Sequence, residues 1–121
     1  MKPSATALAN LNKVWDAGIP VAMGTDAGNI GTLHGPSVFR EMALMAQSGL
    51  TTLEVLRSAT TYGARAMGRD VGALAPGKLA DVLILDADPL ADLQNLSRIH
   101  SVIKDGKLYS PQELIRSISG T

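Results

Sequence analysis

The stretch GIPVAMGTDAG, residues 18–28, decides how the rest of the chain is interpreted. Residues 21–23 are apolar on both faces, which is typical of a strand buried in an α/β sheet. Gly18 suits the position just after a helix, and Pro20 prevents that helix from resuming. We therefore expect a buried strand that ends at Asp26, where a glycine-rich loop begins.

The residues before this stretch predict a helix. Ser4 suits the N-cap position, since its hydroxyl can accept a hydrogen bond from a free N–H of the first turn. Leu8, Leu11 and Trp15 follow at spacings of three and four residues, which places them on one helical face. A helix, a short turn and a buried strand together form half of an α/β unit.

Two further helices are expected after the loop. Pro36 suits the first turn of one of them, whose apolar face consists of Val38, Met42, Met45 and Ala46. Thr51 and Glu54 form the pattern of a capping box, which opens the other. Its expected buried side consists of Val55, Leu56, Ala59, Ala66 and Met67, and Thr60-Thr61 is where it divides in two.

After Gly72 the pattern changes to short strands. Asp105 and Gly106 are typical of a tight hairpin turn between two of them. The expected elements are strands over residues 81–86, 99–104 and 107–109 and a short helix over residues 112–118. The chain is therefore expected to combine a helical α/β part with a small antiparallel β part.

Composition excludes several classes of function. Lys plus Arg equals Asp plus Glu at 11 each, which argues against a nucleic-acid or anionic-membrane partner held by bulk charge. The chain has no cysteine, so disulfides, thiolate zinc sites and thiol catalysis are excluded. No apolar run reaches the roughly 18 residues of a membrane span, and the start lacks the apolar core of a signal peptide. A cytoplasmic protein is expected.

Asp26 is the first candidate for chemistry. In α/β folds, ligands gather at the carboxyl ends of the strands, because the loops there converge on one point. A carboxylate at that edge can bind a metal or accept a proton from a metal-bound water. The alternative is an Asp that caps the following loop through an Asx turn. Position alone leaves both interpretations open.

His34 is the second candidate. A histidine in a glycine loop beside an acid can bind metal, or hydrogen-bond a substrate or transition-state oxygen; the alternative is a polar surface residue. The loop itself lacks the sequence features of a phosphate-binding loop or a dinucleotide fingerprint. His100, in an expected strand, is interpreted as structural or exposed.

Several segments, taken in order, resemble the amidohydrolase superfamily in its imidazolonepropionase-like and Xaa-Pro dipeptidase-like branch. Residues 17–28, which include the stretch GIPVAMGTDAG, resemble that family's last barrel strand. The other matching segments are HG at 34–35, REM at 40–42, the stretch 49–60 from GLT to AT, GALAPGKLADV at 72–82, DADPL at 86–90 and VIKDGK at 102–107. Each motif is weak alone, but their order and spacing over residues 5–109 are specific.

The resemblance implies an α/β fold and a chemistry. Residues 1–72 would be the last part of a (β/α)8 barrel, comprising a helix, the final strand and the following helices. Residues 73–121 would be part of an accessory β-sandwich domain with a carboxy-terminal tail. A mono- or binuclear divalent metal, with zinc as the first choice, would activate water to attack an amide, ester or cyclic amidine carbon of a small-molecule substrate. Asp26 would bind the metal and shuttle the proton, and His34 would face the substrate.

The chain also departs from that family. It has two histidines in all and no His-x-His pair, and a barrel of this type needs about 200 residues or more. One carboxylate and one histidine do not make a site of three or four protein ligands. We therefore expect a piece of a larger enzyme that is inactive and binds no metal tightly by itself. The alternative is a non-catalytic, self-associating structural module, and a homo-oligomer is expected.

Overall fold

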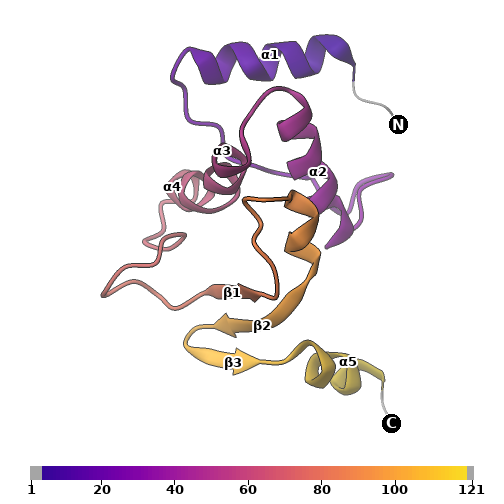
Figure 1. The fold of residues 1–121 in the computed structure, drawn as a ribbon, viewed down its shortest axis with the longest axis vertical. Coiled ribbons are helices and arrows are strands. Elements are labelled where there is room, and N and C mark those ends of the chain that lie inside the picture. Colours follow the sequence, from indigo (N-terminus) through magenta and orange to yellow (C-terminus); the bar gives the residue numbers. More distant parts are fainter. Residues whose placement is uncertain (1–3, 120–121) are drawn as a thin grey trace.

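The computed structural model describes residues 4–119 of the chain. Its helices are α1 (Ala5–Asp16), α2 (Pro36–Gln47), α3 (Thr52–Arg57), the π-helical turn η1 (Ser58–Tyr62), α4 (Gly63–Ala66), the 3-10 helix η2 (Leu93–Ser97) and α5 (Pro111–Ser119). Its strands are β1 (Val82–Leu85), β2 (Ile99–Lys104) and β3 (Lys107–Tyr109). In Figure 1, α1 lies at one end of the molecule, the sheet and α5 lie at the other, and α2 to α4 lie between them.

Helix α1 begins and ends as its sequence predicts. The Ser4 side chain accepts a hydrogen bond of 3.1 Å from the N–H of Ala7, which satisfies one of the free donors of the first turn. Gly18 follows the helix in the left-handed conformation, with φ +74°. The half-buried Leu11 and Trp15 pack against the core, while no residue of α1 is fully buried.

Helix α3, η1 and α4 form one helical run with a widened turn in the middle. The capping box is present: the Thr51 side chain accepts from the N–H of Glu54, and the Glu54 carboxylate accepts from the N–H of Thr51 at 2.7 Å. The turn η1 lies where Thr60-Thr61 was predicted to divide the helix.

The expected burial of Ala66 and Met67 is wrong, because both are exposed, and Ala64 is buried instead. The π turn η1 departs from the α-helical period, so a buried face extrapolated from a continuous α-helix does not hold beyond it. The last helical residue is Ala66, so Met67 lies beyond the final turn.

The carboxy-terminal part is a three-stranded antiparallel sheet in the order β1-β2-β3. Strand β1 pairs with β2 in the register Val82↔Ile103, with an irregularity between Ile84 and Leu85. The β2–β3 turn holds Asp105 and Gly106 at φ +52° and +77°, the left-handed geometry that two-residue hairpins prefer. The predicted strands and the carboxy-terminal helix are thus confirmed.

The core unites both parts of the chain. Its buried members are Met42, Met45, Leu50, Val55 and Leu96. The last of these comes from η2, which was not predicted and which packs against α2. Residues before and after position 72 therefore share this core. Position 72 marks the change from helices to sheet, and its role as a domain boundary stays a prediction.

The buried strand expected over residues 21–23 does not form. Residues 19–26 form neither a helix nor a strand of the sheet, and Ala22 is exposed while Val21 and Met23 are only half-buried. A strand needs a neighbour to complete its hydrogen bonds, and within residues 4–119 no strand runs beside this one. Its backbone is instead held by Ser58 of η1, whose carbonyl accepts from the N–H of Met23 at 3.1 Å.

The surface of the chain is larger than that of a compact protein of its mass. The accessible area is 8424 Å², whereas surface–mass scaling gives about 6,200 Å² for 12.6 kDa. Large apolar side chains are exposed along its length, among them Ile30, Leu33, Leu74, Leu108, Ile115 and Ile118. Much apolar surface is therefore uncovered. None of the helices between residues 4 and 119 combines the length and the apolar character that crossing a bilayer requires.

Candidate active site

Segment 19–26 ends at Asp26. The loop that begins there projects away from the body of the molecule (Figure 1). Asp26 has φ +49°, a left-handed conformation that is uncommon for a residue other than glycine. Backbone conformations of this kind cluster at functional sites, where surrounding contacts hold them. The chain thus turns sharply at the carboxylate that the sequence singled out.

Two residues of the loop hold Asp26 in place. Asn29 donates its backbone N–H to the Asp26 carbonyl at 3.3 Å and its side-chain amide to the Asp26 carboxylate at 3.2 Å. The Thr32 hydroxyl donates to the same carbonyl at 2.9 Å. The sequence analysis did not single out Asn29 or Thr32. The available signal for Asn29 was the Asp-x-x-Asn spacing, since Asp and Asn side chains commonly form hydrogen bonds that close turns.

His34 lies against the beginning of the same loop. The N–H of Gly28 donates to the carbonyl of Thr32 at 3.0 Å, which closes the loop on itself. The Nε2 atom of His34 is 3.4 Å from the place where a Cβ on Gly28 would stand, and Gly28 has φ +103°. The loop therefore brings His34 over a residue two positions from Asp26, so the two candidate residues belong to one compact structure.

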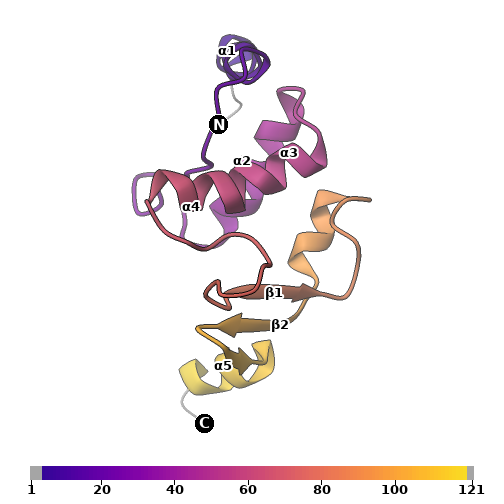
Figure 2. The ribbon, with the colours of Figure 1, turned by 90° about the vertical axis from the view of Figure 1, so that its left-hand side faces the viewer.

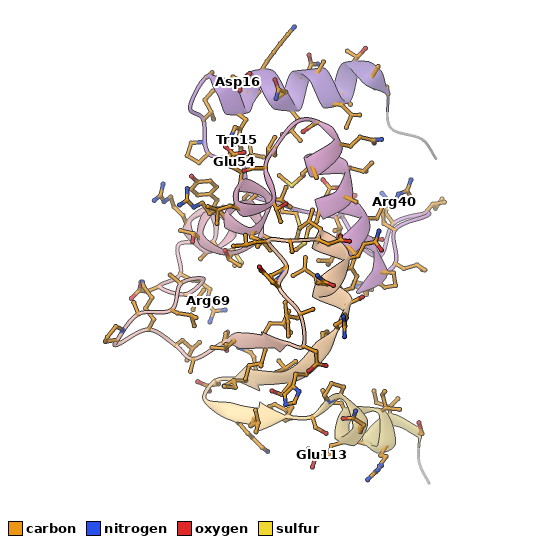
Figure 3. All side chains as sticks on the ribbon, viewed as in Figure 1. Trp15, Asp16, Arg40, Glu54, Arg69 and Glu113 are labelled. Atoms are coloured by element: carbon orange, nitrogen blue, oxygen red, sulfur yellow. The ribbon has the colours of Figure 1, made fainter. Side chains whose placement is uncertain are left out.

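A recess of about 430 Å³ separates this loop from α2. Thr25, which directly precedes Asp26, lines it together with Thr32 from the loop and Arg40 and Glu41 from α2. Figure 3 shows Arg40 on the side of α2 that the loop approaches. One cationic and one anionic side chain thus line this recess.

The described residues do not make a complete metal site. Among residues 4–119, no three His, Cys, Asp or Glu side chains gather closely enough to hold a metal ion. Asp26 is a single carboxylate, whereas zinc takes three or four protein ligands. A metal held by Asp26 would need its other ligands from outside this part of the chain.

The opposite end of segment 19–26 begins beside a cluster of polar and aromatic side chains. There the indole of Trp15 donates to the Glu54 carboxylate at 3.0 Å and lies 5.8 Å from the ring of Tyr62. These three residues, together with Gly18, Ile19, Pro20 and Arg57, line a recess of about 190 Å³. Figure 3 shows Trp15 reaching from α1 toward Glu54 on α3. This contact fixes where the segment starts.

His100 lies on strand β2, in the sheet at the end of the molecule opposite to α1 (Figure 2), away from this loop. It pairs with Asp86 through Nδ1 at 2.9 Å, and both side chains are exposed. The pair links the end of β1 to β2, in agreement with the interpretation of His100 as structural or exposed.

Comparison with known proteins identifies the family. The profile of the amidohydrolase family matches residues 4–109. The chain is 34% identical over 110 residues to an imidazolonepropionase from Geobacillus kaustophilus, covering 85% of this chain and 26% of that protein.

Solved structures agree with the sequence match. A Xaa-Pro dipeptidase superposes with a TM-score of 0.76 at 31% identity, over 85% of this chain and 25% of its own. Molinate hydrolase superposes with a TM-score of 0.75 at 28% identity, over 83% and 25%. The chain thus spans about a quarter of the length of the proteins it matches. On the match over residues 4–109, the chain belongs to the amidohydrolase family.

Proposed function

We propose that this chain is the carboxy-terminal part of a metal-dependent amidohydrolase that hydrolyses an amide, an ester or a cyclic amide of a small molecule. Residues 1–72 supply the last helix, strand and following helices of the barrel, and residues 73–121 supply part of an accessory β domain. The observation that carries the proposal is Asp26, which stands at the end of segment 19–26 in a left-handed turn, held there by Asn29 and Thr32.

In this proposal the complete enzyme holds a divalent metal, zinc as the first choice, which would make water nucleophilic at neutral pH. Asp26 supplies one carboxylate ligand and accepts the proton that leaves the water. Its bond from Asn29 Nδ2 fixes the direction of the carboxylate, as hydrogen bonds to metal-ligating groups commonly do. His34 faces the substrate and donates a hydrogen bond to the oxygen that gains charge.

The relatives support a hydrolase of this kind. Their names are those of an imidazolonepropionase, a Xaa-Pro dipeptidase and a hydrolase of molinate. The match of this chain runs through the loop that holds Asp26 and His34. The ligands that Asp26 lacks within residues 4–119 would come from the upstream three quarters of such a protein.

A second function, that of a self-associating module without activity, rests on the surface of the chain. The accessible area exceeds that of a compact monomer by about 2,200 Å². A standard protein–protein interface buries about 1,200 to 2,000 Å² in total. Half of that area, about 600 to 1,000 Å², lies on each partner, so a second copy would cover part of this excess.

Expression of the chain with and without its upstream protein separates the two functions. The longer protein, supplied with zinc, is assayed against Xaa-Pro dipeptides and cyclic amides, and the 121-residue chain is assayed in parallel. We expect hydrolysis by the longer protein alone. A longer protein that binds metal yet hydrolyses no substrate of either class would contradict the enzymatic proposal.

A further inference from the structure

Ser58 is an unusual residue for the middle of a helical run. It is fully buried, with 0% of its surface exposed, and serine in a helix interior commonly turns its hydroxyl back to a carbonyl of the preceding turn. Thr60 in the same π turn does so, donating to the carbonyl of Leu56 at 2.7 Å. The Ser58 hydroxyl instead leaves the helix and donates to the carbonyl of Val21 at 2.5 Å.

The backbone of Ser58 contacts the same segment. Its carbonyl accepts from the N–H of Met23 at 3.1 Å, while its own N–H donates within the helix to the carbonyl of Glu54. A carbonyl has two lone pairs, and the widened π turn departs from the regular i→i−4 bonding of the α-helix. Ser58 thus offers segment 19–26 one acceptor from its backbone and one donor from its side chain.

These two bonds have the pattern of a parallel β-ladder. In such a ladder a residue accepts from the N–H one position after its partner and donates its own N–H to the carbonyl one position before it. With Ala22 as the partner, Ser58 accepts from Met23 and donates to Val21. Its hydroxyl takes the place of the N–H, which the helix already uses.

We propose that Ser58 is a positioning residue for Asp26, because it acts as a one-residue strand neighbour that fixes segment 21–23 and hence the turn into which that segment leads. The role rests on the proposed function of Asp26. Only two residues, Gly24 and Thr25, lie between Met23 and Asp26, so fixing Met23 limits the positions that Asp26 can take.

Hydrogen exchange of the Met23 amide in the 121-residue chain tests the first half of this role. We expect protection in the wild type and exchange about tenfold faster in Ser58→Ala, the order expected for loss of one buried hydrogen bond. Ser58→Cys, with a weaker donor of similar size, is expected to lie between them. Thr60→Val is the matched control, since it removes a hydroxyl from the same turn that bonds only locally.

The amide signals of Asp26 and Asn29 test the second half. The NMR chemical shifts of these amides are expected to change in Ser58→Ala and to remain unchanged in Thr60→Val. The shift of the Met45 amide in the core should remain unchanged in both variants. An unprotected Met23 amide in the wild type overturns the proposal without any variant. Faster exchange at Met23 in Ser58→Ala that leaves the Asp26 and Asn29 signals unchanged also overturns it. So does an equal loss of protection at Met45 in that variant, because it would mean a general loss of stability. None of these measurements depends on catalysis, so they stand apart from a failure of the hydrolase proposal.

Discussion

The indole N–H of Trp15 donates a 3.0 Å hydrogen bond to Oε1 of Glu54, 39 residues further along the chain. The same carboxylate accepts, through Oε2, from the N–H and the hydroxyl of Thr51, each at 2.7 Å. One side chain therefore caps α3 and ties it to α1. This places the start of the segment that leads to Asp26.

Replacing Glu54 with alanine should lower the free energy of unfolding by about 1 to 2 kcal/mol, because its charged carboxylate would no longer accept hydrogen bonds from Thr51 and Trp15. It should also shift the emission of Trp15, the single tryptophan of the chain. Urea unfolding followed by fluorescence measures both. The control is Glu113→Ala, which removes a comparable cap from α5 and should leave the Trp15 emission of the folded chain where it was.

The stability of the chain should fall in acid partly through Glu54. Hydrogen bonds from the Thr51 side chain, the Thr51 backbone and Trp15 lower its pKa from the ordinary value of 4.5. A lowered folded pKa gives stability that is present above the unfolded pKa and is lost as the pH falls through the folded one. The wild type should therefore weaken below about pH 4.5, and Glu54→Gln should weaken less steeply. Equal slopes for the two would contradict this. Asp81, whose pKa is lowered chiefly by Lys104, accounts for a remaining slope.

Asp26→Asn should nearly abolish hydrolysis by the longer protein, because a carboxamide cannot accept the proton and is a poorer metal ligand. The expected loss in turnover is about 10²-fold or more. The comparison variant is Asp88→Asn, which changes a turn in the carboxy-terminal part and should keep its activity. Retention of more than about a tenth of wild-type turnover by Asp26→Asn would rule out the proton-accepting role.

The 121-residue chain alone should bind zinc only weakly. Asp26 and His34 come from one loop, and no third ligand gathers with them within residues 4–119, whereas tight zinc sites use three or four protein ligands. Equilibrium dialysis at micromolar zinc measures the stoichiometry. One ion bound per chain, and lost in Asp26→Asn, would mean that a complete site exists here.

The chain should form dimers at tens of micromolar. Large apolar side chains such as Ile30, Leu33 and Leu74 are exposed, soluble monomers rarely expose large contiguous apolar patches, and closed two-fold pairs are the commonest solution for identical chains. Light scattering after size exclusion measures the mass. A single monodisperse species of 12.6 kDa would show that these surfaces stay solvated.

Gly28→Ala should disturb the Asp26 loop. A Cβ there would meet Nε2 of His34 at 3.4 Å, and the backbone at φ +103° disfavours any side chain. A conformation of this kind costs a residue with a side chain about 1 to 3 kcal/mol. Gly24→Ala is the matched control, since Gly24 has no positive φ and its Cβ would meet nothing within 4 Å. Shifts of the His34 ring signals in the first variant and not in the second are expected; similar spectra for both would count against the loop geometry.

The features that sequence predicted well depend on neighbours in the chain. The Ser4 cap, the Thr51–Glu54 capping box and the Asp105-Gly106 turn each involve residues within a few positions of one another, so their patterns carry the geometry. The resemblance to the amidohydrolase superfamily is likewise confirmed by the family match over residues 4–109, and its imidazolonepropionase-like side by the 34% identity to an imidazolonepropionase over 110 residues. The position of Asp26 at the start of a loop also followed from local pattern, although the strand expected before it does not form.

The features that sequence missed depend on distant partners. Residues 21–23 have the composition of a buried strand, but a strand forms only where another runs beside it. Ala64 is buried in place of Ala66 because the helix is not continuous; Thr60-Thr61 indicated a division there, but not the conformation of the turn that follows. The burial of Leu96 in the core was not predicted, because a short 3-10 helix has too few residues to show a hydrophobic period in the sequence. The roles of Asp26 and His34 stay predictions.

The shared core has a consequence for the order in which the chain is made. Met42, Met45, Leu50 and Val55 all leave the ribosome before Leu96, the residue that closes the core over them. Until synthesis has passed η2, the nascent chain therefore carries an apolar face that has no intramolecular cover, and faces of this kind attract other chains. Chaperone binding during translation should concentrate on α2 and α3 and end once Leu96 has emerged.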